Sequence, residues 1–302
     1  MEKRTEFDVI IIGGSYAGLS AAMALGRSLR NVLVLDSGKP CNRQTPHSHN
    51  FLTQDGETPA AIAQKAQEQV LAYPTVTFLA EEALTATGQN QDFQVTTASG
   101  ATFHASKLIF AAGIKDLMPN LEGFTSCWGI SVLHCPYCHG YEVRNQEWGI
   151  MANGDMAFEL VKLLQNWTPT LTVFTNGPST LTPEQREVLQ RKKVLLNEGE
   201  ITALVHDQGY VQQIALKDGS SHTVKAIFAR PAFEQHCPLP EELGCELTET
   251  GHLKVDGFQK TTVPGIFAAG DATTMMRSVA VAVAAGLVAG AMVNKELIEE
   301  RF

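Results

Sequence analysis

The alternation of apolar and polar positions predicts a dinucleotide-type βαβ unit at the start of this chain. Residues 7–12 are apolar and mostly β-branched, which predicts a short buried strand. A glycine-rich turn at 13–18 follows, and the small residues of 19–29 predict a closely packed helix. Residues 31–35 predict a second strand, which ends at Asp36. A strand, a glycine turn, a helix and a second strand complete one βαβ unit, so we expect parallel strands here.

A second unit of the same kind begins near the middle of the chain. Residues 149–151 predict a strand, residues 154–165 a helix, and residues 170–174 the next strand. Two such starts in 302 residues, at roughly 150 residues per domain, predict an α/β protein with two nested Rossmann-like domains of three layers each.

The first domain is predicted to be interrupted by the second. Near Gly244 the pattern changes again, and a long small-residue helix from about 277 to 299 closes the chain. We therefore predict one domain from residues 1–116 and 245–302, and an inserted domain at 117–244.

Composition narrows the class of protein and its partners. Apolar residues make up 44% and charged residues 18%, which predicts a sizeable core. The net charge of −9 disfavours a nucleic-acid partner. The polar start passes straight into the first strand, which predicts no secretory leader. The longest uncharged apolar stretch, Ser278 to Val293, is shorter than the about 20 residues of a membrane span. We expect a cytoplasmic protein without a membrane partner.

The first glycine turn is a candidate pyrophosphate site. Gly13 and Gly18 hold the outer positions of a G-x-G-x-x-G pattern, and Ser15 replaces the middle glycine. Such a turn lets the backbone approach a pyrophosphate at a helix N-terminus, and an acid after the second strand suits ribose hydroxyls. An ordinary glycine turn is the alternative. The candidate binding residues are Gly13, Gly14, Ser15, Ala17, Gly18 and Asp36.

The pattern Cys135-Pro-Tyr-Cys138 is the candidate chemical centre. Two thiols at this spacing can close a small disulfide and exchange it with a partner. With only six cysteines in the chain, a disulfide-stapled secreted scaffold is disfavoured. Zinc would need further ligands, for which Cys127, His134 and His139 are the nearby candidates, and a purely structural disulfide is a third possibility. Redox catalysis is the favoured interpretation, and we predict no metal.

Two histidines bracket the pair. His134 and His139 are placed to take or return a thiol proton near neutral pH, although a histidine is often a structural hydrogen-bonding residue. His236 is a weaker substrate-site candidate. The remaining cysteines are isolated and are interpreted as non-catalytic: Cys41, Cys237 and Cys245.

These motifs together resemble the low-molecular-weight thioredoxin reductase family of pyridine nucleotide-disulfide oxidoreductases. The resemblance rests on IIGGSYAG, the turn at 111–113, the Cys pair and FAAGDATT at 267–274, and it spans nearly the whole chain. It implies that the first loop holds FAD. It also implies that the helix starting near Ser278 points its N-terminus at the flavin edge that becomes negative on reduction. The further cofactor-binding residues implied are Ala112, Gly113, Gly270, Asp271, Ser278 and Val279.

The resemblance also assigns roles around the Cys pair. Cys138 faces the flavin and Cys135 attacks the partner disulfide. The usual thioredoxin reductases carry an Asp where this chain has His139, and HCPYCHGYE looks more like the branch of gliotoxin- and holomycin-type dithiol oxidases. In that branch the histidine matching His134 is an acid/base, and oxygen receives the electrons. The family further implies a homodimer.

The second nucleotide loop departs from the family pattern. Ala152 stands where the first glycine of G-x-G-x-x-A is expected, and the basic cluster that holds the 2′-phosphate of NADPH is missing after the strand at 170–174. We predict weak or lost nicotinamide binding. The rival interpretation keeps a pyrophosphate at this helix and lets Arg186 or Arg191 replace the basic cluster.

The predicted function is a flavin-dependent thiol–disulfide oxidoreductase. It exchanges electrons between FAD, the Cys pair and a partner, either a thioredoxin-like protein or a small dithiol or disulfide. An oxygen-dependent oxidase of a small dithiol is one alternative, and a non-enzymatic flavin redox sensor is another.

Overall fold

The computed structural model describes residues 4–302 and divides into two compact units. Unit 1 runs to Arg43 and resumes over Phe51–Lys115 and Phe233–Phe302. Unit 2 comprises Gln44–Asn50 and Asp116–Ala232. Residues 1–3, at the start of the first predicted domain, lie outside the described part.

The units differ from the predicted domain ranges in three places. Asp116 joins unit 2. Residues 233–244 join unit 1, where Leu239 is buried in the core with Ala86 and Phe103. Residues 44–50 join unit 2, where Gln44 and Thr45 lie against the backbone of Gly129. Local sequence pattern carries no signal for the last two associations, because both depend on packing between distant segments.

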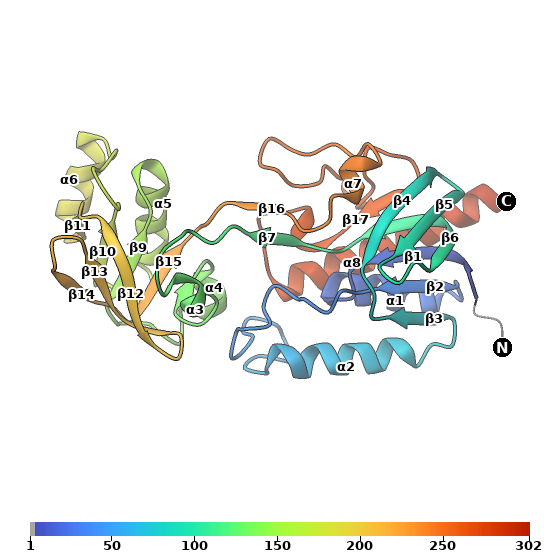
Figure 1. The fold of residues 1–302 in the computed structure, drawn as a ribbon, viewed down its shortest axis with the longest axis horizontal. Coiled ribbons are helices and arrows are strands. Elements are labelled where there is room, and N and C mark those ends of the chain that lie inside the picture. The colour runs from blue at the N-terminus through green and yellow to red at the C-terminus, as the bar shows by residue number, and fades with distance from the viewer. Residues whose placement is uncertain (1–3) are drawn as a thin grey trace. The chain divides into compact units, whose positions relative to one another are not determined.

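Unit 1 is built on a seven-stranded sheet of order β3-β2-β1-β6-β5-β4, with β17 paired to β6 (Figure 1). The parallel strands are β1 (Glu6–Ile12), β2 (Val32–Leu35), β3 (Val76–Leu79), β6 (Thr102–Phe110) and β17 (Ile266–Ala268). The antiparallel edge consists of β4 (Ala83–Gln89) and β5 (Asp92–Thr97). The helical elements are α1 (Tyr16–Arg27), α2 (Pro59–Leu71), α7 (Leu239–Glu242), the 3₁₀ turn η1 (Gly270–Ala272) and α8 (Val279–Arg301).

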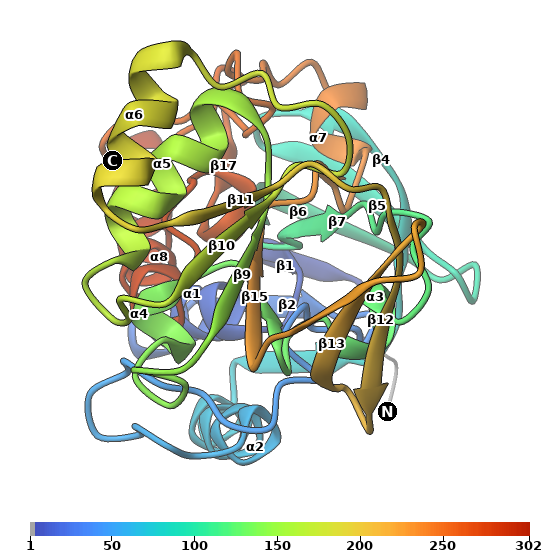
Figure 2. The same ribbon diagram turned by 90° about the vertical axis from the view of Figure 1, so that its left-hand side faces the viewer.

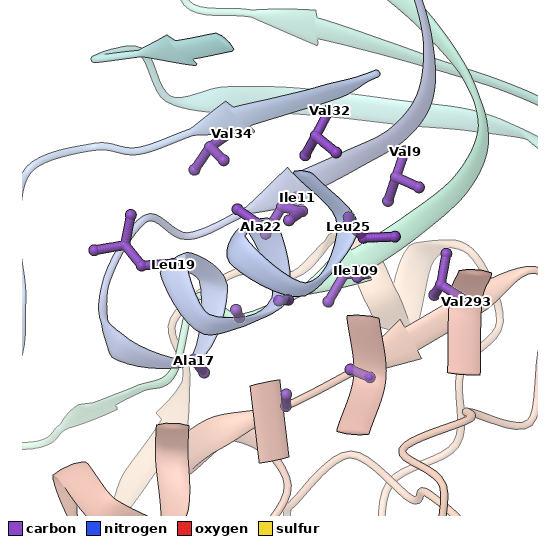
Figure 3. Close-up of a cluster of buried hydrophobic side chains, with 14 of the residues drawn as sticks. Val9, Ile11, Ala17, Leu19, Ala22, Leu25, Val32, Val34, Ile109 and Val293 are labelled. Atoms are coloured by element: carbon purple, nitrogen blue, oxygen red, sulfur yellow. The ribbon is translucent and has the colours of Figure 1, made fainter. Parts of the chain in front are cut away.

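The core of unit 1 explains its apolar strands and small-residue helices. Val9 and Ile11 of β1 pack toward α1, where Leu19, Ala22 and Leu25 line the same cluster (Figure 3). One core cluster, with α1, covers one face of β1, and a second core cluster of unit 1 covers the other face. Residues 9–12 of β1 therefore form a continuous apolar run.

Helix α8 is long and apolar enough, by length and composition, to cross a membrane. In unit 1 it lies directly on α1, since a Cβ at Gly286 would be only 2.1 Å from the carbonyl oxygen of Ala17. A Cβ at Gly290 would be 2.7 Å from the carbonyl oxygen of Ala21. The small residues of α8 therefore serve close helix packing, as the sequence predicts for a buried helix.

Unit 2 contains a five-stranded parallel sheet of order β11-β10-β9-β15-β8, of which Figure 2 labels the first four strands, and a three-stranded antiparallel sheet of order β12-β13-β14. The parallel strands are β8 (Val132–Leu133), β9 (Trp148–Met151), β10 (Leu171–Phe174), β11 (Leu195–Asn197) and β15 (Ala226–Ala229). The antiparallel strands are β12 (Ile201–Asp207), β13 (Tyr210–Leu216) and β14 (Ser221–Thr223). The helices are α3 (Phe124–Cys127), α4 (Pro136–His139), α5 (Gly154–Leu164) and α6 (Pro183–Arg191).

A two-stranded ribbon of β7 (Ile114–Asp116) and β16 (Phe233–Gln235) carries the chain between the units. The prediction of an α/β protein with two nested Rossmann-like folds is confirmed, because each unit has its own parallel sheet with helical crossovers.

Candidate active site

The first nucleotide loop is shaped by glycines whose place no larger residue can take. Gly13 follows β1 with φ of +107°, and a Cβ there would lie 2.4 Å from the carbonyl carbon of Ala111. A Cβ at Gly18 would lie 1.8 Å from the carbonyl oxygen of Gly13. Close backbone contact of this kind is what a dinucleotide loop requires.

The surroundings of this loop suit an anionic ligand. Ser15 precedes α1, whose first turn, residues 16–19, consists of uncharged residues, so no acidic side chain in that turn offsets the positive end of the helix dipole. Asp36, at the end of β2, accepts hydrogen bonds from the Gly14 N–H at 2.9 Å and the Gly38 N–H at 3.2 Å. The carboxylate is thus held at the carboxyl end of the parallel strands, where a ribose would lie.

The other predicted cofactor residues lie at the same sheet edge in unit 1. Ala112 and Gly113 follow β6, and Gly270 and Asp271 follow β17. Gly270 has φ of +81°, and a Cβ there would lie 3.0 Å from the Cβ of Ala17 in α1. Ligands of α/β sheets bind at the carboxyl ends of the strands. The residues therefore fit FAD as the resemblance implies.

Helix α8 begins beside this edge. Ser278 is its N-cap and accepts a hydrogen bond from the Val281 N–H at 3.2 Å, and Val279 is the first helical residue. Arg277 lies 3.5 Å from the carboxylate of Asp271. An ordered helix N-terminus therefore stands next to the Gly270 turn, as the family pattern predicts.

We predict that the purified protein is yellow and that Gly18→Ala removes the flavin. The added methyl group would overlap the Gly13 carbonyl, so the loop and α1 must separate. Absorbance near 450 nm and chromatography of the released cofactor test this, and FAD rather than FMN is expected because of the pyrophosphate loop. Gly257→Ala is the matched control: Gly257, like Gly18, has no positive φ, and a Cβ there would meet no atom within 4 Å. A colourless native protein that FAD does not reconstitute would contradict the assignment.

The Cys pair lies in unit 2 at the start of α4. Cys135 and Cys138 form a disulfide with a Cα–Cα distance of 5.4 Å. Cys135 is the N-cap residue of α4, and Pro136 begins the helix with a preset φ. The turn is closed by the Gly140 N–H, which donates to the Pro136 carbonyl at 2.7 Å. One turn of helix thus brings the two sulfurs together, which suits reversible thiol–disulfide exchange.

The two flanking histidines have different surroundings. The His134 ring lies 6.0 Å from the Trp128 ring. The His139 ring lies 6.2 Å from the His49 ring, in an edge-to-face arrangement. Burial, together with the nearby charge of His49, lowers the pKa of His139 to about 4. His139 is therefore uncharged at neutral pH and can accept a proton.

The remaining candidates have ordinary structural surroundings. Burial raises the pKa of the Cys237 thiol to about 11 and also raises those of Cys127 and Cys245. The Cys41 sulfur lies 3.9 Å from the Asp271 carboxylate. The backbone N–H of His236 donates to the Gly113 carbonyl at 3.2 Å. Within residues 4–302, no three His, Cys, Asp or Glu side chains come together as a metal site.

The second nucleotide loop is closed by its own side chains. The Asn153 side-chain oxygen accepts hydrogen bonds from the Gly154 N–H and the Thr180 N–H, each at 2.8 Å. The Asn153 amide donates to the Pro178 carbonyl at 3.0 Å. A Cβ at Gly154 would lie 2.7 Å from the Thr180 hydroxyl oxygen. We call Asn153, Gly154, Pro178 and Thr180 the Asn153 clamp, and it covers the N-terminus of α5.

The arginine nearest to this loop is already paired. Arg186 lies in α6 and donates to the Glu198 carboxylate at 2.8 Å and to the Ser179 carbonyl at 3.2 Å. The Ser179 N–H donates to the same carboxylate at 2.7 Å, and these bonds lower the pKa of Glu198. Arg186 therefore serves the loop itself, which weighs against its replacing the missing basic cluster.

Sequence reasoning did not find the Asn153 clamp, or His49 with its neighbour Glu142. A residue such as Asn153 before a helix signals a cap, but its bonds to Thr180 depend on how the loop after β10 folds back. His49 signals only a polar loop until the fold brings it to His139.

Comparison with known proteins agrees with the fold and the motifs. Residues 7–286 match the family described as "Pyridine nucleotide-disulphide oxidoreductase". The chain is 31% identical to "Thioredoxin reductase sirT" of Leptosphaeria maculans, over 95% of this chain and 93% of that protein. It is 37% identical to the crystal structure of an oxidoreductase from Agrobacterium tumefaciens, with a TM-score of 0.91 over 97% and 99% of the two chains. A putative thioredoxin reductase from Bacillus anthracis is 29% identical, with a TM-score of 0.93 over 98% and 100%.

Proposed function

Since this chain belongs to the pyridine nucleotide-disulphide oxidoreductase family, as an FAD-dependent enzyme of its thioredoxin reductase-like branch, we propose that its electrons come from a dithiol rather than from a nicotinamide. The Asn153 clamp is the observation that carries the proposal. In the family a pyrophosphate is held by the N–H groups at the start of the helix that follows the second nucleotide loop. Here that helix is α5, and the N–H of its first residue, Gly154, donates to the Asn153 side chain. A nicotinamide dinucleotide would have to displace both Asn153 and Thr180.

The Cys pair performs the exchange with the dithiol. One substrate thiolate attacks the Cys135 sulfur, the disulfide bond breaks, and Cys138 leaves as a thiolate. The second substrate thiolate then attacks the mixed disulfide and releases Cys135, so the substrate departs as a disulfide. His134 and His139 are the proposed acceptors of the two thiol protons. FAD, held by the turn at Gly13 and Gly18 with Asp36, would supply the two-electron oxidation that re-forms the disulfide from the two thiols of the pair, and dioxygen, reduced to hydrogen peroxide, is the proposed final acceptor of the electrons.

Anaerobic mixing tests the electron donor. We expect dithiothreitol to bleach the flavin absorbance quickly, and NADPH or NADH to bleach it slowly and without saturation. The missing arginine–phosphate contact alone lowers the binding free energy of NADPH by about 1.5–3 kcal/mol, which weakens its affinity by about one to two powers of ten. Rapid, saturable bleaching at low NADPH concentration would overturn the proposal and return the chain to the ordinary reductases. Readmitting air should then yield one hydrogen peroxide per dithiol oxidised.

Assembly and location are part of the same proposal. The family resemblance supports a homodimer, the net charge of −9 argues against a nucleic-acid partner, and the six cysteines, too few for a disulfide-stapled secreted scaffold, support a cytoplasmic protein. Sedimentation equilibrium of the yellow protein tests the dimer, and a monomer at micromolar concentration would contradict it.

A further inference from the structure

A loop from a distant part of the sequence places a histidine beside the Cys-pair turn. Residues Gln44–Asn50 belong to unit 2, and within it the His49 ring stands 6.2 Å from the His139 ring at an interplanar angle of 85°. The His49 Nε2 atom lies 3.7 Å from a carboxylate oxygen of Glu142. His47, in the same loop, has its ring 6.4 Å from the His49 ring.

This arrangement is partly shielded from water. The side chain of His49 is 20% exposed and that of Glu142 is 40% exposed. His49 from the loop faces His139, Glu142 from the segment after α4 lies beside His49, and Cys138 precedes His139 in sequence. His47 stands behind His49. His49 is therefore a cationic group, when protonated, that faces His139 at close range.

We propose that His49, held by Glu142, is a positioning residue for His139 during thiol–disulfide exchange. The inference rests on the proposed role of His139 as a proton acceptor, but not on which reagent supplies the electrons. His49 itself exchanges no proton with the thiols. It holds the His139 ring in the edge-to-face arrangement, and its own positive charge disfavours protonation of His139.

Electrostatics gives this contact its effect. When His49 is protonated, it forms an ion pair with Glu142. Two imidazolium rings about 6 Å apart repel each other. Burial lowers the pKa of His139 most, and His49 adds to the lowering. The His139 ring thus stays uncharged at pH values where an unassisted histidine would be protonated, and it can still take the proton of an attacking thiol.

The test compares the rate of anaerobic flavin bleaching by dithiothreitol in variants and native holoenzyme across about pH 4.5–7.5. At each pH, the rate of the variant is divided by the rate of the native protein. This ratio cancels the effect of the ionisation of dithiothreitol, which is the same for both proteins. His49→Gln removes the charge, so the pKa of His139 should rise by about 0.5–1 unit. The rate ratio should stay constant near pH 7.5, and near pH 4.5 it should fall to about one to two thirds of that value. His49→Lys restores a positive charge and should abolish the fall.

Controls separate this inference from the proposed function. His47→Gln changes the same loop without touching the His139 ring, and its ratio should be flat with pH. His139→Gln should lower the rate at neutral pH, and if it does not, the proposed role of His139 fails. If His139→Gln lowers the rate while His49→Gln leaves the pH dependence native, the positioning role of His49 is wrong. A pH-independent loss in both His49 variants would assign His49 to structure alone.

Discussion

Replacing either cysteine of the pair with serine should abolish dithiol turnover, with a loss of at least about a thousandfold, because removal of a nucleophile acts on that scale. Cys135 and Cys138 form the disulfide of unit 2, and neither alone can close it. Oxygen consumption with dithiothreitol measures the loss.

The two variants should differ in their spectra. The family resemblance gives Cys138 the place facing the flavin, so Cys135→Ser should show a long-wavelength thiolate–flavin charge-transfer band. Cys138→Ser should lack that band and still leave a thiol at Cys135 that reacts with iodoacetamide. Cys237→Ser is the matched control, because that thiol is half-buried and its pKa is raised to about 11. Full turnover in both pair variants would show that the pair is not the catalytic centre.

Replacing Lys107 with methionine should destabilise unit 1 by about 3 kcal/mol, the lower end of the cost of breaking a buried ion pair. Lys107 lies in β6 and its side chain is 0% exposed. Its ammonium group donates to Asn90 and to Glu300 of α8, each at 2.6 Å, and lies 3.2 Å from Glu296. Methionine keeps the volume but removes this cation from both carboxylates of the C-terminal helix, of which Glu296 keeps its ion pair with Lys260 at 3.3 Å.

The chain itself supplies the probes for this measurement. The tryptophans Trp128, Trp148 and Trp167 all lie in unit 2, whereas the FAD loop lies in unit 1. In urea, flavin release should shift to lower concentration by about 1 M, while the tryptophan fluorescence transition should stay in place. Lys115→Met is the control, since its pair with Glu234 is 61% and 50% exposed and should contribute less than about 1 kcal/mol. Equal midpoints for Lys107→Met and native protein would refute the role assigned to Lys107.

The sequence predicts the parallel sheets well because their strands are buried on both faces. The predicted strand at 7–12 is observed as Glu6–Ile12, and the predicted helix at 154–165 as Gly154–Leu164. The first helix begins at Tyr16 instead of Leu19, since the last three residues of the predicted glycine turn already form the first turn of the helix. Strand β6 is harder to read, because the first half of Thr102–Phe110 alternates between buried and half-exposed positions.

Contacts between distant segments could not be predicted from pattern. Lys107 reads as a polar residue directly before the apolar residues 108–110, and its carboxylate partners lie in the last helix. The missing basic cluster after β10 is visible in the sequence, but the closure of the loop by Asn153 depends on the turn geometry at Thr180. His49 pairs with His139 only because residues 44–50 fold onto unit 2.

The placement of residues 44–50 limits how this enzyme can be cut and rebuilt. A gene fragment for residues 116–232 would encode the disulfide and both flanking histidines, but not the peptide that carries His49. Grafting that fragment into a related flavoprotein would therefore pair its His139 with the host's own loop. A chimera that is to keep the native environment of the Cys pair needs two crossovers more, one on each side of the short peptide.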